Sequence, residues 1–240
     1  MRKIIFYLLK KVSRTIYSLI HEIKDDLTDG YIARKLNEEK HREVLEVFGN
    51  HLKKSIRFTQ LKQIRKYAID LALSNASDKS DKEDLFFMEF GVFNGTSANF
   101  FSKYVNKLYA FDSFEGLPEE WEGVLPKGYF NLNKKIPNLN SNVVPIVGFV
   151  ENTLDDFLKK NNPKINFVHI DMDLYNPTKF TLEKIKPYLV KGAIILFDEL
   201  YNYVNWKEGE YKALKEVFGD DEYLFRAFNI NQYQVVIQII

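Results

Sequence analysis

The stretch LFFMEFGVFNGTS, residues 85–97, decides the fold of this chain. Six residues, apolar except for one acid, lead into a turn with two glycines, Gly91 and Gly95, which allow the backbone to approach a ligand closely. Thr96 and Ser97 follow, and both are residue types that cap helix N-termini. A short apolar run, a glycine turn and a capping pair together predict a buried strand, a tight turn and a helix.

Six further short apolar runs follow, most of them separated by helical patterns, and each predicts a strand. They are LYAFD (108–112), VVPIVG (143–148), INFVHID (165–171), AIILFDE (193–199), YLFRAF (223–228) and YQVVIQII (233–240). Strands that are apolar on both faces and separated by helices belong to a parallel sheet covered on both sides. The last two runs are too close for a crossover helix, so we expect an antiparallel hairpin. The predicted fold is α/β and doubly wound, with seven strands, mostly parallel, and a terminal hairpin.

The residues before about position 75 show a different, purely helical pattern. Residues 37–48 and 59–73 carry apolar side chains three and four positions apart. The polar run SNASDKSDKED at 74–84 is the best candidate for a boundary. We therefore predict a helical N-terminal region at 1–78, acting as a cap or in dimerisation, and a sheet domain at 79–240.

The composition excludes several classes of protein. Lys and Arg number 34 against 33 Asp and Glu, so the chain as a whole has no electrostatic footprint for nucleic acid. The absence of cysteine excludes thiolate catalysis and Cys-ligated metal sites. The apolar cluster at residues 4–9 is too short to cross a bilayer, and basic residues interrupt it, so we expect a cytoplasmic protein.

Residues 1–24 combine basic side chains with apolar residues at helical spacing, which predicts an amphipathic helix. Such a helix buries its apolar stripe against its own domain or a partner subunit, or it lies on an anionic membrane surface. We expect packing within a homodimer, and weak membrane-surface contact through residues 1–24 is the alternative.

The ends of the predicted strands carry the candidate ligand residues, because a doubly wound sheet binds ligands beyond the carboxyl ends of its strands. Asp112 ends the second strand, at the distance from Gly91 where an acid accepts the hydroxyls of an adenosine ribose. A dinucleotide site would show G-x-G-x-x-G, but residue 93 is Phe, and the chain has no G-x-x-x-x-G-K-[ST] phosphate loop. The residues therefore predict an adenosine ligand without a pyrophosphate.

Four acidic residues close the fourth and fifth predicted strands: Asp171, Asp173, Asp198 and Glu199. Neighbouring strand ends bring these carboxylates together, and such a cluster is costly unless a cation joins it. An oxygen-rich site suits Mg²⁺, Mn²⁺ or Ca²⁺. The alternative is that the acids cap strand-to-helix turns, and for Asp173 we favour this interpretation.

Two further features stay open at the level of the sequence. His169 is the one histidine of the sheet domain, and it is either a catalytic base or a buried, hydrogen-bonded side chain. Residues 113–142 are rich in Gly and Pro and lack periodicity, which predicts a lid over the site or a disordered insertion. Trp121, within this segment, either lines the pocket or anchors the lid.

Four motifs in the sheet domain resemble the class I S-adenosylmethionine-dependent methyltransferases and, more narrowly, the macrocin O-methyltransferase (TylF-like) family. They are EFGVFNGTS (89–97), AFDSFEGLPEEW (110–121), HIDMDLYNPT (169–178) and FDELYNY (197–203). The resemblance covers residues 86–240. It implies a Rossmann-like class I methyltransferase fold, S-adenosylmethionine as the cofactor, and methylation of a hydroxyl of a sugar or glycoside in glycan or natural-product biosynthesis.

The resemblance also implies roles for individual residues. In the family, E-x-G-x-x-x-G binds the amino-acid end of the cofactor, and the acid of the next strand binds the ribose. The expected cofactor-binding set is Glu89, Phe90, Gly91, Asn94, Gly95, Thr96, Ser97, Asp112, Ser113, Phe114, Gly148, Phe149 and Asp171. A Mg²⁺ ion would be held by Asp171, Asp198 and Glu199, although the family usually has Asp-Asp where this chain has Asp198 and Glu199. Asp171 and His169 are the expected catalytic residues.

Two rival functions belong to other classes. An NAD-dependent oxidoreductase on the same architecture is disfavoured by Phe93 and the missing third glycine. The second rival is a non-catalytic, membrane-docked binding module. The acceptor is also open, because a small aromatic diol such as a catechol would satisfy the same metal chelation as a sugar.

Overall fold

The computed structural model describes residues 30–75 and 84–240. The chain divides into two compact units, Met1–Glu46 and Val47–Ile240. Helix α2 (Tyr31–Lys54) begins in the first unit and ends in the second. The amphipathic helix predicted at 1–24 and most of the boundary predicted at 74–84 lie outside the described residues.

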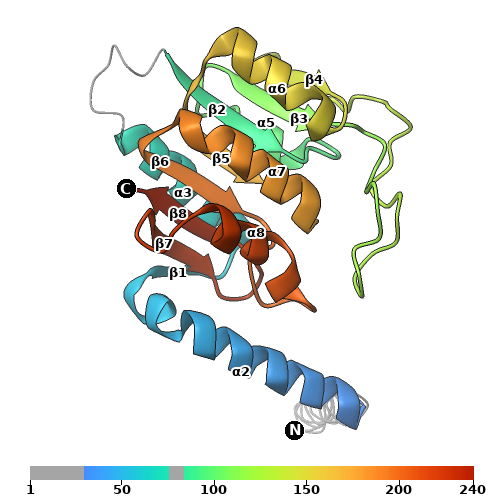
Figure 1. Ribbon diagram of the computed structural model, residues 1–240, viewed down its shortest axis with the longest axis vertical. Helices are drawn as coiled ribbons and strands as arrows, with labels where there is room; N and C mark the ends of the chain where they lie inside the picture. Colours follow the sequence, from blue (N-terminus) through green and yellow to red (C-terminus); the bar gives the residue numbers. More distant parts are fainter. Residues whose placement is uncertain (1–29, 76–83) are drawn as a thin grey trace, which may run out of the picture. The chain divides into compact units, whose positions relative to one another are not determined.

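The second unit is built around an eight-stranded sheet with the order β1-β7-β8-β6-β5-β2-β3-β4 (Figure 1). The strands are β1 (Ile56–Phe58), β2 (Leu85–Phe90), β3 (Leu108–Asp112), β4 (Val143–Val147), β5 (Lys164–Ile170), β6 (Leu189–Phe197), β7 (Tyr223–Asn229) and β8 (Val235–Ile239). Neighbouring strands pair in parallel, except that β8 is antiparallel to both β6 and β7. The predicted fold class, a mostly parallel α/β sheet with a terminal antiparallel hairpin, is confirmed.

The sheet has one strand more than the seven that the sequence predicts. The additional strand is β1, which pairs in parallel with β7 and places Ile56 opposite Ala227. Three residues are too few to show an alternating pattern, and the partner strand lies far along the chain. Pairing with β7, rather than a local signal, therefore makes this segment a strand.

Helices cover both faces of the sheet (Figure 1). They are α3 (Leu61–Asn75), α5 (Thr96–Phe101), α6 (Val150–Asn161), α7 (Tyr175–Ile185) and α8 (Glu210–Val217), with the short 3₁₀ helices η1 (Lys186–Tyr188) and η2 (Trp206–Glu208). Helices α3 and α5 lie on one face, and α6, α7 and α8 lie on the other. In the part of the chain that the structure describes, none of the helices has the length and apolar character needed to span a bilayer.

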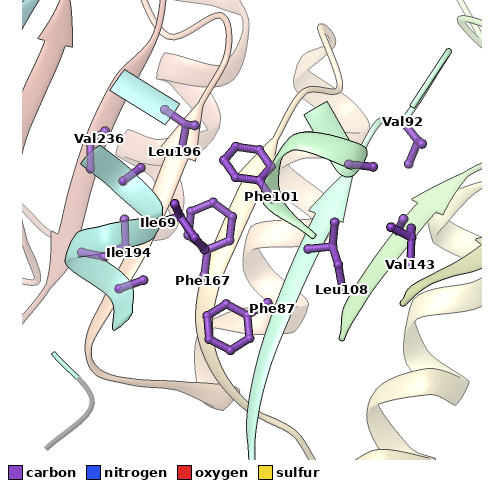
Figure 2. Packing of buried hydrophobic residues seen from close by; sticks show 14 of the residues in the cluster. Ile69, Phe87, Val92, Phe101, Leu108, Val143, Phe167, Ile194, Leu196 and Val236 are labelled. Atoms are coloured by element: carbon purple, nitrogen blue, oxygen red, sulfur yellow. The ribbon is translucent and has the colours of Figure 1, made fainter. Parts of the chain in front are cut away.

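The core beneath α3 and α5 is a cluster of aromatic and aliphatic side chains. Ile69 of α3, Phe101 of α5 and Phe167 of β5 converge in this cluster, and all three are fully buried (Figure 2). Helix α3 buries one side because its apolar residues recur at helical spacing. The buried residues of this side are Ile64, Ala68, Ile69 and Ala72. Helix α3 is thus part of the core of the sheet unit, although its residues fall within the predicted N-terminal region at 1–78.

The strand order positions the site. From β2 the chain runs outward to β3 and β4, and it then returns to build β5 and β6 on the other side of β2. The order therefore reverses between β2 and β5, and a crevice forms beyond the carboxyl ends of strands at such a point. The residues that follow β2, β3, β4, β5 and β6 meet there.

Candidate functional site

A cavity of about 560 Å³ lies beyond these strand ends, within the size range of small-molecule sites. Many of the predicted cofactor residues line it. They are Gly91, Asn94, Thr96, Ser97, Asp112, Ser113, Gly148, Phe149 and Asp171. Asp198 and Glu199 of the predicted metal set also line the cavity. The sequence therefore predicts much of this wall.

The other four predicted cofactor residues are buried and do not line the cavity, because each packs against or bonds to other parts of the protein. They are Glu89, Phe90, Gly95 and Phe114. The Glu89 carboxylate bonds to His169, and the Phe90 ring stacks on a core ring, that of Phe111, with centroids 4.7 Å apart. Gly95 packs against the lid, where an added Cβ would lie 2.6 Å from a Leu139 methyl carbon. Phe114 belongs to the hydrophobic core.

The turn after β2 requires glycine at its first position. Gly91 has a φ of +85°, and an added Cβ would lie 1.6 Å from the carbonyl oxygen of Asp171. The N–H of Asp171 donates to the carbonyl of Phe90 at 2.8 Å, so the ends of β2 and β5 are held in close contact. No other residue type fits at Gly91 without displacing the end of β5.

The Asp112 carboxylate at the end of β3 is held by backbone donors. Its Oδ2 accepts the N–H groups of Val92 at 2.7 Å and Phe93 at 2.8 Å, and its Oδ1 accepts the N–H of Phe114 at 2.6 Å. A carboxylate offers about four lone-pair sites, so at least one remains for a ligand hydroxyl. Asp112 therefore connects the glycine turn to the start of the 113–142 segment and still faces the cavity.

A buried chain of charged groups runs behind the ends of β2, β5 and β6. The two ring nitrogens of His169 contact Glu89 Oε1 at 2.9 Å and Asp198 Oδ1 at 3.3 Å. Asp198 Oδ1 also accepts a hydrogen bond from Arg65 Nη2 of α3 at 3.0 Å. Two carboxylates thus alternate with two cationic side chains.

These contacts fix the charges of the groups. Burial opposes the imidazolium, but the hydrogen bonds with Asp198 and Glu89 outweigh burial and raise the pKa of His169 to about 10. Burial would also raise the pKa of Asp198, but His169 and Arg65 hold it well below its usual range. His169 is fully buried and both ring nitrogens are occupied. This geometry favours the buried, hydrogen-bonded histidine over the catalytic base.

A second acidic group faces the cavity. Asp171, Asp173 and Glu199 each offer a carboxylate oxygen, and these atoms lie within 4.8 Å of one another. The metal set that the resemblance implies is Asp171, Asp198 and Glu199, but Asp198 Oδ1 is engaged by Arg65 and His169. Asp173 joins the group instead, at a left-handed φ of +63°. Helix α7 begins without a side-chain cap hydrogen bond, so the interpretation of Asp173 as a cap is wrong.

Burial and mutual repulsion make it unfavourable for all three carboxyl groups to be ionised at once. Burial, and next the charge of Asp198, raise the pKa of Asp171 and Glu199 well above their usual ranges, and that of Asp173 to about 7. Glu210 of α8 lies behind the group and is fully buried, and it accepts the N–H of Glu199 at 3.2 Å. Several acids crowded in this way are stabilised either by protons or by a bound cation.

The 113–142 segment is folded over the site and tied at several points. The Asn140 amide donates to Ser102 Oγ at 2.9 Å, and the Asn176 amide of α7 donates to Glu119 Oε1 at 3.0 Å. Trp121 lines the cavity, and its ring also contacts that of Tyr203, with centroids 5.4 Å apart. Trp121 therefore both lines the pocket and anchors the 113–142 segment.

Two charged residues of the site, Arg65 and Glu210, are not indicated by the sequence alone. In the sequence, Arg65 resembles the many charged residues that face solvent on amphipathic helices. In the structure it directly follows Ile64, which is buried. Glu210 stands in the first turn of α8, where acids are common for reasons of helix polarity. Only the assembled sheet brings both to the strand ends.

Comparisons with known proteins agree with this geometry. Residues 88–200 match the profile of a family described as a methyltransferase domain. The fold is similar to that of CalS11, described as a calicheamicin methyltransferase, with 24% identity over 88% of this chain and 93% of that one, and a TM-score of 0.58. The comparison with curated proteins finds no match.

Two further structures share the fold. An apo structure of CalS11, described as TDP-rhamnose 3′-O-methyltransferase, is 23% identical over 88% of this chain and 95% of that one, with a TM-score of 0.52. The O-methyltransferase NovP is 17% identical over 74% and 78%, with a TM-score of 0.52. Residues 88–200 are thus similar to a methyltransferase domain. The predicted enzyme class, S-adenosylmethionine-dependent methyltransferase, is confirmed.

Proposed function

We propose that this methyltransferase transfers the methyl group of S-adenosylmethionine to a hydroxyl of a sugar or glycoside, with the assistance of a divalent cation. The observation that carries the proposal is the composition of the cavity wall at the strand ends. One part of its wall, at the ends of β3 and β4, has the residues expected for an adenosine, and the other, at β5 and β6, has a group of carboxylates. A neutral hydroxyl needs such a group to become a nucleophile.

The cavity wall fits the cofactor. Asp112 retains lone pairs for the ribose hydroxyls, and Gly148 and Phe149 follow β4, where the adenine is expected. The cofactor supplies an electrophilic sulfonium methyl group when bound. The Gly91 turn allows the methionine part to approach the backbone between β2 and β5. The protein's contribution is mainly to position the two reactants and exclude water.

The second acidic group fits a hard divalent cation such as Mg²⁺, because all its donors are carboxylate oxygens. Asp171, Asp173 and Glu199 would hold the ion, and Glu199 Oε2 is buried without a hydrogen-bond partner among the described residues. Asp198 lines the same cavity and has Oδ2 to offer. A bound cation would lower the pKa of an acceptor hydroxyl. Two neighbouring hydroxyls of a sugar present the geometry that such an ion chelates.

The narrower assignment to sugars and to the TylF-like family draws on the motifs and on the neighbouring folds. CalS11 is described as a TDP-rhamnose 3′-O-methyltransferase, and NovP as an O-methyltransferase. The acceptor would enter beneath the 113–142 segment, where Trp121, Val124 and Phe130 line the cavity. These apolar walls suit the less polar face of a deoxysugar or an attached aglycone.

The proposal is tested by methyl transfer from isotopically labelled S-adenosylmethionine to three classes of acceptor: nucleotide-linked deoxysugars, glycosides and catechols. Each reaction is run with Mg²⁺, with EDTA, and with EDTA followed by excess Mg²⁺. We expect labelled O-methyl product from a sugar acceptor, loss of product with EDTA, and recovery when Mg²⁺ is restored. Transfer that is indifferent to EDTA would contradict the metal role, and transfer to catechols alone would contradict the sugar assignment.

A further inference from the structure

The cavity wall contains a single basic side chain among the described residues that line it, that of Arg65. Arg65 lies on α3, outside the residues 88–200 that match the methyltransferase profile. S-adenosylmethionine carries a carboxylate on its amino-acid end, and a carboxylate brought into a wall rich in acids needs a cationic partner. Arg65 is the residue that the wall provides.

Arg65 has donors to spare for such a partner. Its Nη2 donates to Asp198 Oδ1 at 3.0 Å, whereas its Nε is buried without a hydrogen-bond partner among the described residues. A guanidinium has five N–H donors, so the contact with Asp198 uses only part of its capacity. The side chain is 13% exposed, which means that it is held among neighbouring groups rather than extended into solvent. An arginine held in this way can bind a carboxylate and donate hydrogen bonds to it, and little side-chain entropy is lost.

The strand order brings the amino-acid end of the cofactor to Arg65. The sheet runs β6-β5-β2-β3-β4, with the ribose expected at Asp112 of β3 and the adenine beside β4. The methionine part must then extend in the opposite direction, past the Gly91 turn toward the ends of β5 and β6. Arg65 contacts Asp198 at the end of β6. Glu89, which the sequence suggested for this end of the cofactor, is buried and bonded to His169, and its charge would repel a carboxylate.

We propose that Arg65 binds the carboxylate of the amino-acid end of S-adenosylmethionine, while it remains bonded to Asp198. The inference rests on the proposed function, because it takes S-adenosylmethionine as the ligand of this cavity. It assigns a cofactor-binding role to α3, and it links the cofactor through Asp198 to the acidic groups at the ends of β5 and β6. The ammonium group of the same amino-acid end would face those acids.

Calorimetric titration with two ligands tests this assignment. S-adenosylhomocysteine has the amino-acid end, and 5′-methylthioadenosine has the same adenosine thioether without it. We expect Arg65→Gln to weaken S-adenosylhomocysteine binding about tenfold or more, since charge-assisted hydrogen bonds are lost, and to change 5′-methylthioadenosine binding less than about twofold. Arg65→Lys should restore part of the loss. Lys62→Gln, an exposed position on the same helix, is the matched control and should change neither affinity.

The outcomes separate this inference from the proposed function. If Arg65→Gln weakens both ligands equally, Arg65 acts by holding Asp198, and the inference is overturned; an unchanged affinity for both overturns it too. The wild-type protein gives an independent measurement that does not depend on the variant folding. Its affinity for decarboxylated S-adenosylhomocysteine should be about tenfold lower than for the parent compound, and equal affinities would overturn the inference. If the wild type binds none of these ligands, the proposed function fails together with it.

Discussion

The two ends of the cavity are stabilised in different ways. At the end of β3 a single carboxylate, Asp112, accepts three backbone N–H bonds of 2.6 to 2.8 Å. At the ends of β5 and β6, among the described residues, acidic side chains outnumber the two cationic side chains that contact them, Arg65 and His169. Those acids are Asp171, Asp173, Asp198, Glu199 and Glu210.

This difference separates two kinds of binding site. The Asp112 end is complete within the protein, because the backbone compensates its charge and the remaining lone pairs point to a ligand. The acidic end has more negative groups than the protein compensates, so protons or an added cation must complete it. The first end suits a neutral adenosine, and the second suits a metal ion with an acceptor hydroxyl.

Gly91 lies where the two ends meet, and replacing it should have the largest effect. Gly91→Ala would place a Cβ 1.6 Å from the Asp171 carbonyl oxygen, at a φ of +85°. We expect a loss of about 3 kcal/mol or more in the free energy of unfolding, from backbone strain and displacement of the end of β5. Urea unfolding followed by circular dichroism measures this loss.

A second glycine separates the two causes of that loss. Gly128 has a φ of +78°, but an added Cβ there would meet nothing within 4 Å. Gly128→Ala should therefore cost only the backbone term of about 1–2 kcal/mol. Equal losses in the two variants would show that the close contact between β2 and β5 contributes little.

The pH dependence of stability probes the acidic end of the cavity. The folded protein raises the pKa of His169 from its ordinary 6.5 to about 10, because its hydrogen bonds with Asp198 and Glu89 outweigh the cost of burial. The stabilisation is therefore fully present below pH 6.5 and is lost as the pH rises through about 10. In EDTA, urea unfolding should show stability falling over this window by a few kcal/mol.

Replacement of the histidine isolates its contribution. His169→Gln keeps hydrogen-bonding capacity but cannot titrate, so the decline in stability between pH 6.5 and 10 should become shallower. His51, which contacts Phe225 and does not line the cavity, provides the comparison, and His51→Gln should leave the decline unchanged. A wild-type stability that rises with pH over this window would contradict the assignment of a protonated His169.

The sequence predicts the features that depend on neighbours along the chain. The seven apolar runs, the Gly91 turn and the position of Asp112 all follow from short patterns, and the structure places them as expected. Strand β1 escapes prediction because its only strong signal is its partner, β7. Local patterning identifies elements that form their own hydrophobic faces, and it misses those that pairing alone creates.

The charges of the site escape prediction for a related reason. Asp171, Asp173, Asp198 and Glu199 look equivalent in the sequence, as acids that close two strands. The folded chain distinguishes them, because Arg65 of α3 and His169 bond to Asp198 and leave Asp173 to join the group at the cavity. Which carboxylate obtains a cationic partner depends on a helix far away in the sequence, so spacing alone carries no information about it.

The smallest loss of stability is expected for a substitution of Asp112, whose carboxylate accepts hydrogen bonds from backbone N–H groups. In Asp112→Asn, the amide has one acceptor oxygen in place of two, so at least one of the N–H groups of Val92, Phe93 and Phe114 loses its partner. We expect a loss of about 1 kcal/mol in unfolding free energy and a roughly tenfold weaker binding of S-adenosylhomocysteine. Because the proposed Mg²⁺ site is at the other end, the ratio of activities with and without the ion should not change. Asp156→Asn, at an exposed position outside the cavity wall, is the control for loss of one negative charge. A changed Mg²⁺ requirement in Asp112→Asn would mean that the two ends are coupled, and the division between a backbone-completed end and a cation-completed end would have to be abandoned.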